Sequence, residues 1–293
     1  MRRAVLLLLL FLAPVAVFAG MVAVDRIYGA PGRGWDYVVT VLLPSTENGG
    51  NLPEILGPAD ASRPLVVIDA GHGGKDPGAG AGEIKEKQLT LALALALRDE
   101  LLRGGGVRVA LTRSDDRFLV LSDRNNIARR LGADLFISLH ADSTEVGSSA
   151  RGATVYTLSE RGSNETAERM AARENAADEV NGVRLETQSA AVNAALVDLS
   201  QRLANARSEE FAALILREGE GKLPFRERAG QSGAFVVLKS PDVPSVLFET
   251  GYINNPEDLA RLSSRAGQAA IAEVLASAIR VYFARQAVPQ IGT

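Results

Sequence analysis

From residue 65 onward, short apolar runs alternate with longer segments of helical periodicity. Most of the runs are solidly apolar, a pattern typical of strands covered on both faces. The expected strands are residues 65–69, 107–112, 135–139, 153–157, 234–238 and 245–248. The expected helices between and after them are residues 87–102, 121–131 and 264–285. The pattern predicts an α/β fold, a three-layer α/β/α domain with a mostly parallel sheet of about six strands.

The stretch from about residue 159 to residue 233 interrupts this alternation, because no strand is expected within it. It predicts a helical insertion before the last two strands. One helix is expected over residues 163–180, where Ser163 or Asn164 can cap it and acidic residues occupy the first turn. A longer helix is expected over residues 190–219. The large apolar residues expected along one of its faces are Leu196, Leu199, Leu203, Phe211 and Leu214.

The first residues predict export. A basic start, Arg2 and Arg3, precedes an apolar run from Ala4 to Phe18, and small residues then precede a cleavage point after Ala19. We expect residues 1–19 to be a signal peptide; the alternative is an uncleaved anchor. Residues 20–63 are turn-rich and are expected to be a linker, residues 64–286 a catalytic domain and residues 287–293 a tail. We expect no stable membrane span after cleavage.

Composition narrows the chemistry. The 293 residues carry a net charge of −3, and no long block of Lys or Arg indicates a nucleic-acid partner. The chain has no cysteine, so no disulfide can form, and a metal site must use His, Asp and Glu.

Both histidines of the chain follow predicted strands. His72 follows the first, His140 ends the third, and Glu249 ends the last. Functional groups gather at the carboxyl ends of parallel strands. A single histidine at such a position is more often structural. Here both histidines of the chain lie at such positions, which favours a metal site. Zinc sites that leave a position for water commonly combine two histidines with one carboxylate. The candidate carboxylates are Asp76, Glu83, Glu86 and Asp142, of which Glu86 is attractive because a rigid helix begins there.

Glu249 has a separate expected role. Hydrolysis needs a group that takes a proton from the attacking water and delivers it to the leaving amine. The alternative is a structural carboxylate bound by backbone amides, because a charged group that ends a buried strand needs a partner.

Several motifs resemble one known family. They are VVIDAGHGGKDPGA, KEKQLTLALALAL, LTRSDDRFLVLSDRNNIARRLGADLFISLHAD and PSVLFETGYINNPED, in this order within residues 64–283. They resemble the zinc-dependent N-acetylmuramoyl-L-alanine amidases of the Amidase_3 type, which cleave the amide between N-acetylmuramic acid and L-alanine in peptidoglycan. The resemblance implies one Zn²⁺ held by His72, Glu86 and His140, with Glu249 as the catalytic glutamate. It thereby selects Glu86 among the carboxylates.

The predicted insertion resembles that of the cell-division amidases. In those proteins a helix covers the zinc site until a LytM-domain activator of the divisome displaces it. The resemblance implies a periplasmic enzyme that separates daughter cells. Among Glu168, Glu174 and Glu179, Glu174 is the candidate for an autoinhibitory zinc contact; the alternative is a solvated helix face. Residues 20–63 are too few for the N-terminal β-domain of larger family members.

Other polar residues have two interpretations each. Arg113 and Arg124 either bind carboxylates of the substrate peptide or brace the sheet edge. Asn254 either contacts substrate or forms a turn. Two rival functions are a zinc exopeptidase of similar fold and a catalytically inactive divisome or wall-binding protein. The first would release free amino acids, and the second would have lost a ligand or the glutamate.

Overall fold

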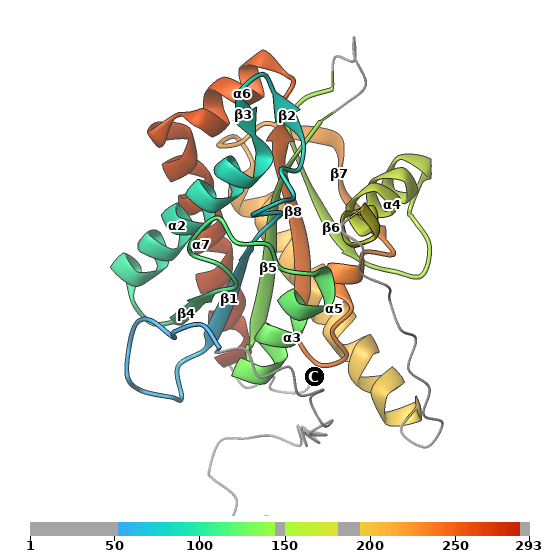
Figure 1. Ribbon diagram of the computed structural model, residues 1–293. Helices are drawn as coiled ribbons and strands as arrows, with labels where there is room; N and C mark the ends of the chain where they lie inside the picture. Colours follow the sequence, from blue (N-terminus) through green and yellow to red (C-terminus); the bar gives the residue numbers. More distant parts are fainter. Residues whose placement is uncertain (1–51, 144–149, 181–193, 288–293) are drawn as a thin grey trace, which may run out of the picture. The chain divides into compact units, whose positions relative to one another are not determined.

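The sheet and its helices belong to the compact unit Ser45–Arg285. The structure, a computed structural model, describes residues 52–143, 150–180 and 194–287 (Figure 1). The predicted signal peptide, most of the predicted linker and most of the predicted tail lie outside these residues. No helix in the described ranges is both long and apolar enough to cross a membrane.

Six strands form the central sheet, in the order β4-β1-β5-β8-β6-β7. Their bounds are β1 Leu65–Ala70, β4 Arg108–Leu111, β5 Leu135–Asp142, β6 Ala153–Leu158, β7 Phe225–Gly233 and β8 Ser245–Tyr252. Strands β4, β1, β5 and β8 run parallel, and β6 pairs antiparallel with β8 and parallel with β7. A short hairpin of β2 (Gly80–Ala81) and β3 (Ile84–Lys85) precedes the helix that begins at Glu86. The sheet is mixed but mostly parallel, as predicted.

Helices cover both faces of this sheet (Figure 1). Their bounds are α2 Glu86–Gly104, α3 Leu121–Leu131, α4 Glu165–Val180, α5 Ala194–Gly219, α6 Pro256–Ser263 and α7 Arg265–Ala287. One apolar core joins α2, α5 and α7 to one face, and a smaller core joins α3, α4 and the 3₁₀ turn Val236–Leu238 to the other. This arrangement confirms the three-layer prediction and the helical segment before the last two strands.

The expected strand at residues 234–238 is wrong, and so is the expectation that residues 159–233 contain no strand. Those residues form a loop and the 3₁₀ turn, and the strand lies earlier, at β7. Among the described residues, strand β7 pairs only with β6 at the sheet edge, and its sequence FRERAGQSG has no apolar run that would reveal it. Residues 234–238 are apolar because Phe235, Val237 and Leu238 pack into the smaller core. Burial without strand pairing therefore produced the strand-like pattern.

The expected apolar face of α5 holds only in its C-terminal part. Phe211 and Leu214 are buried, whereas Leu199 and Leu203 are 55% and 56% exposed. The side chain of Leu196 lies outside the described set.

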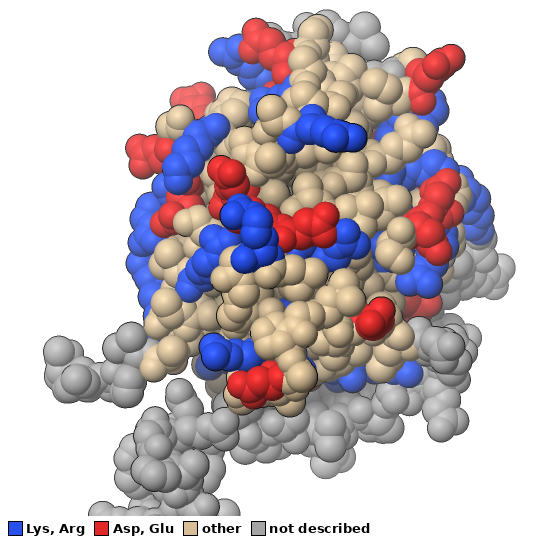
Figure 2. All heavy atoms as spheres, turned by 90° about the vertical axis from the view of Figure 1, so that its left-hand side faces the viewer, with Lys and Arg blue, Asp and Glu red and all other residues tan. Residues whose placement is uncertain are grey.

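Figure 2 shows the side of the molecule that is on the left in Figure 1. Acidic and basic side chains are interspersed on this face.

Candidate metal centre and active site

The candidate ligands come from three elements that meet at the carboxyl edge of the sheet. His72 lies two residues beyond β1, His140 lies within β5, and Glu86 is the first residue of α2. Gly71 allows the imidazole of His140 to lie close to the loop that carries His72, because a Cβ at residue 71 would lie 2.5 Å from Cε1 of His140. The glycine after β1 therefore leaves room for the second imidazole.

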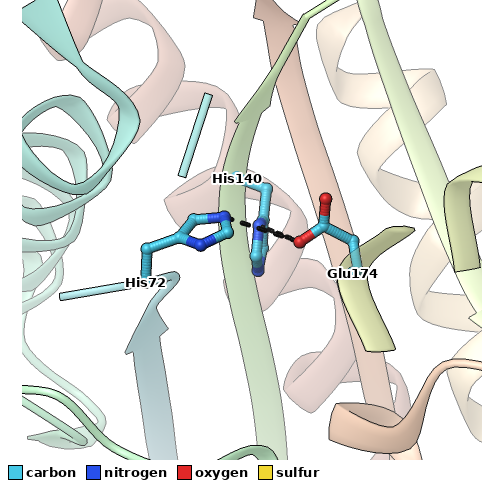
Figure 3. A group of neighbouring side chains, drawn as sticks. All are labelled: His72, His140 and Glu174. Carbon is cyan, nitrogen blue, oxygen red and sulfur yellow. Dashed lines mark ion pairs between the residues drawn. The ribbon is translucent and has the colours of Figure 1, made fainter. Parts of the chain in front are cut away.

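The donor atoms lie at the separations of a single coordination shell. Nε2 of His72 is 3.1 Å from Oε2 of Glu86 and 3.5 Å from Oε2 of Glu174. Nδ1 of His140 is 3.2 Å from Oε1 of Glu86 and 3.2 Å from Oε2 of Glu174. Figure 3 shows both imidazoles and Glu174 converging, with Glu174 approaching from α4.

These separations fit a tetrahedral metal ion. Zinc bonds of about 2.0–2.1 Å to nitrogen and oxygen give ligand–ligand edges of about 3.3 Å. In the described part of the chain, buried Nε2 of His72 has no hydrogen-bond partner, as a metal-ligating nitrogen requires. His72, His140 and Glu174 form a group that could hold a metal, and the oxygens of Glu86 face the same two nitrogens.

The carboxylate of Glu86 is fixed by backbone amides. Oε2 accepts a hydrogen bond from the amide of Ala79 at 2.8 Å, and Oε1 accepts one from the amide of Ala141 at 2.9 Å. Burial raises its pKa, but the facing imidazoles outweigh burial and lower the pKa well below its ordinary value. The first turn of a helix also favours a negative charge. Glu86 therefore remains an ionised, rigid donor.

The other sequence candidates for a carboxylate ligand lie elsewhere. Asp76 accepts from Nδ1 of His72 at 2.8 Å, which leaves Nε2 to face the donor group. A carboxylate behind a ligating histidine in this way fixes its tautomer and ring orientation. Asp142 pairs with Arg173 of α4, and Glu83 is exposed.

The imidazoles are basic because carboxylates surround them. Burial lowers the pKa of His72, but the charge of Glu86 and the hydrogen bond with Asp76 raise it to about 10. Burial also lowers the pKa of His140, and Glu174 and Glu86 together raise it to about 10. A metal ion that binds here must therefore displace protons.

Glu249 lies beside this group but is not paired with it. It is opposite His140 in the register of β5 and β8, and opposite Thr154 in the register of β8 and β6. Among the described residues, neither of its buried carboxyl oxygens has a hydrogen-bond partner. Burial raises its pKa well above the ordinary value, and the charges of Asp142 and Glu174 add to the effect. The predicted alternative, a carboxylate bound by backbone amides, finds no support in these contacts.

Helix α4 closes the site and is anchored along its length. Arg173 pairs with Asp142, and Asn175 donates to the carbonyl of Ala234 at 2.9 Å. Asp178 accepts from the amide of Leu121 with both oxygens at 3.1 Å, at the start of α3. Sequence reasoning missed these three anchors, because a helical pattern does not reveal which polar residues face another element.

The three glutamates of α4 named from the sequence differ in environment. Glu174 is buried against both histidines, and Glu168 is exposed. The side chain of Glu179 lies outside the described set. Only Glu174 of the two described glutamates can therefore reach a metal at this site.

The remaining polar candidates serve the protein scaffold in this structure. The guanidinium groups of Arg113 and Arg124 are buried and donate to backbone carbonyls of the loop after β1. These contacts support bracing rather than binding of a substrate carboxylate. Asn254 is exposed in the turn after β8, and its neighbour Asn255 caps α6. A substrate contact by Asn254 stays a prediction.

Two imidazoles and a carboxylate that converge at a sheet edge, beside an unpaired acid, are typical of metal-dependent hydrolases. Residues 66–281 match the Amidase_3 family, described as N-acetylmuramoyl-L-alanine amidase. The chain therefore belongs to the N-acetylmuramoyl-L-alanine amidases, and the predicted family and enzyme class are confirmed.

Relatives and solved structures agree with this assignment. The amidase AmiA of Escherichia coli (strain K12) is 40% identical over 243 residues, which cover 82% of this chain and 83% of that protein. The amidase AmiC of Escherichia coli O6:H1 is 34% identical over 286 residues, which cover 93% of this chain and 67% of that protein. The structure of amidase AmiC2 of Nostoc punctiforme superposes with a TM-score of 0.53 at 30% identity, over 76% of this chain and 98% of that one.

Proposed function

We propose that the protein uses one zinc ion, held by His72, Glu86 and His140, to hydrolyse the amide between N-acetylmuramic acid and L-alanine in peptidoglycan. The observation that carries this proposal is that the oxygens of Glu86 lie 3.1 Å from Nε2 of His72 and 3.2 Å from Nδ1 of His140. The position of Glu249 next to His140 supports its role as the proton-transfer group.

Zinc bound there would polarise the amide carbonyl and acidify a water molecule. Glu249 takes the proton of the attacking water and delivers it to nitrogen of the leaving L-alanine. No covalent bond to the protein is needed, because water is the nucleophile. The unpaired oxygens of Glu249 suit this role, since a carboxylate bound by backbone donors would be a weaker base.

Glu174 serves as an autoinhibitory contact in this proposal. Its carboxylate approaches the same two nitrogens as Glu86 does. Glu174 lies on α4, however, whereas Glu86 begins α2. Its carboxylate takes the position that the reacting water or carbonyl needs. Burial raises the pKa of Glu249, and the charges of Asp142 and Glu174 add to this effect, whereas Arg173 of the same helix lowers it. Displacement of α4 frees the position that Glu174 takes.

An activator must then move α4. By its likeness to the cell-division amidases, we propose a LytM-domain protein of the divisome as the partner and peptidoglycan remodelling during cell separation as the setting. We place the enzyme in the periplasm, with residues 1–19 as its signal peptide.

A sacculus-digestion assay with product mass analysis tests the activity. We expect muramoyl glycan and stem peptides that begin with an intact L-alanine. Glu249→Ala should retain one zinc per chain by metal analysis and lose turnover. Release of free amino acids would instead favour an exopeptidase, and near-normal turnover by Glu249→Ala would refute its role as the base.

A second experiment tests autoinhibition separately. Glu174→Ala should raise the basal rate of the purified protein, and deletion of residues 163–180 should raise it further. The exposed glutamate of the same helix offers a matched control, Glu168→Ala, which should leave the basal rate unchanged. Full basal activity of the unaltered protein would contradict the proposal.

A further inference from the structure

The backbone of His72 has a conformation that a histidine rarely adopts. Its φ is +59°, and no other residue besides glycine has a positive φ in the described ranges. Such a left-handed conformation costs of order 1–3 kcal/mol for a residue with a Cβ, and it persists only where surrounding contacts enforce it. The contacts that enforce it here come from two buried arginines.

Three consecutive carbonyls, at the end of β1 and in the loop after it, each accept hydrogen bonds from these arginines. The carbonyl of Ala70 accepts from Nε of Arg113 and from Nη1 of Arg124, both at 2.8 Å. The carbonyl of Gly71 accepts from Nη2 of Arg113 at 2.8 Å. The carbonyl of His72 itself accepts from Nη2 of Arg124 at 2.9 Å. Arg124 is therefore the one of the two arginines that binds His72 directly.

Arg124 is in turn fixed by a buried carboxylate. Oδ1 of Asp69 accepts from Nη1 of Arg124 at 2.9 Å and from the hydroxyl of Thr112 at 2.6 Å. Oδ2 of Asp69 accepts from the hydroxyl of Ser138 at 2.7 Å. Asp69 is fully buried and Arg124 is 2% exposed. A buried ion pair often adds little to the stability of a fold. A role in positioning the loop would explain why this pair of Asp69 and Arg124 is buried here.

We propose that Arg124 is a positioning residue for the metal site, which sets the backbone of His72 so that Nε2 faces Glu86. This inference rests on the proposed zinc function. The planar guanidinium binds three carbonyls, of Ala70, His72 and Leu119, and it binds the carboxylate of Asp69 at the same time. The single ammonium of a lysine cannot reproduce this fork geometry. Without it, the loop after β1 relaxes from the strained conformation, and His72 leaves the coordination geometry.

The test compares zinc affinity among full-length variants by competitive chelator titration with Zn²⁺ alone. Arg124→Lys keeps the charge and should bind zinc 10- to 100-fold more weakly, the usual effect of losing an outer-shell partner. Arg129→Lys is the matched control. Arg129 lies on the same helix and pairs with Asp242 at 3.0 Å rather than with the loop after β1. The zinc affinity of the Arg129→Lys variant should therefore stay within twofold of that of the unaltered protein.

Thermal unfolding without zinc separates positioning from stability. If Arg124 only stabilises the fold, Arg124→Lys melts lower but retains the zinc affinity of the unaltered protein, and this result overturns the inference. Absence of zinc binding by the unaltered protein refutes the proposed function instead. Should Arg124→Lys not fold, Thr112→Val removes one donor to Asp69 and loosens Arg124 more gently. It should weaken zinc binding at least threefold, and an unchanged affinity also overturns the inference.

Discussion

Glu249 is the residue where function and stability oppose each other most directly. The residue is 4% exposed, and neither of its buried carboxyl oxygens has a hydrogen-bond partner in the part of the chain that the structure describes. Burial and the neighbouring carboxylates hold its pKa well above 4.5, so the folded protein keeps it neutral where the unfolded chain ionises it. Glu249→Gln has nearly the same shape and no charge at any pH. We therefore expect it to abolish turnover and to stabilise the metal-free protein.

The magnitude follows from linkage. A carboxyl whose pKa is raised by folding destabilises the folded state increasingly as pH rises from its unfolded value of 4.5 toward its folded value. Each pH unit contributes about 1.4 kcal/mol. The gain in the free energy of unfolding from Glu249→Gln should therefore be less than about 1 kcal/mol at pH 5, only half a unit above 4.5, and larger at pH 7. Glutamine loses this dependence because it does not titrate.

The assay is urea denaturation at pH 5 and pH 7 in the presence of a zinc chelator. Glu168→Gln is the matched control, because this exposed carboxylate on α4 should give almost no change at either pH. With zinc bound, the gain from Glu249→Gln should shrink, since a nearby cation favours the ionised carboxylate. A gain of equal size at both pH values, or no gain at pH 7, would refute the reasoning.

Three further substitutions probe the surroundings of the site. Asp178→Ala removes the acceptor of the Leu121 amide at the start of α3, so it should lower the free energy of unfolding by about 1–2 kcal/mol. It should also raise the basal sacculus-digestion rate, and an unchanged rate would exclude Asp178 as an anchor of α4. Gly71→Ala places a Cβ 2.5 Å from the ring of His140, so metal analysis should find less than one zinc per chain, and full occupancy would contradict this. Thr154→Val removes a buried hydroxyl that has no partner among the described residues, so urea denaturation should show equal stability or a gain of about 1 kcal/mol; a loss above that would mean the hydroxyl is bonded.

The sequence predicted the parallel part of the sheet well, because its strands are buried along most or all of their length and are rich in apolar residues. Strands β1, β5 and β8 are fully buried along their length. Edge strand β7 escaped because its residues contact solvent on one side and its sequence is charged and small. Hydrophobicity reports burial: edge strand β4 is mostly buried and was predicted, whereas edge strand β7 is not and escaped.

The site was predictable to the extent that it depends on strand ends. His72, His140 and Glu249 follow or end apolar strands, so topology alone brings them to one edge. The partners of α4 were not predictable in the same way. The contact of Arg173 with Asp142 joins residues far apart in sequence across a helix whose docking no local pattern specifies.

Helix docking and metal binding must influence each other if Glu174 is a ligand. A contact that strengthens zinc binding when α4 is docked strengthens the docking of α4 by the same factor when zinc is present, because coupling free energies are reciprocal. The anchors at Arg173 and Asp178 act on the same equilibrium without touching the metal. The proposed activator would therefore work against both the anchors and the metal contact, and it should bind the zinc-free protein more tightly than the zinc-loaded protein. Glu174→Ala should abolish this difference, since it removes the metal contact and leaves the anchors in place.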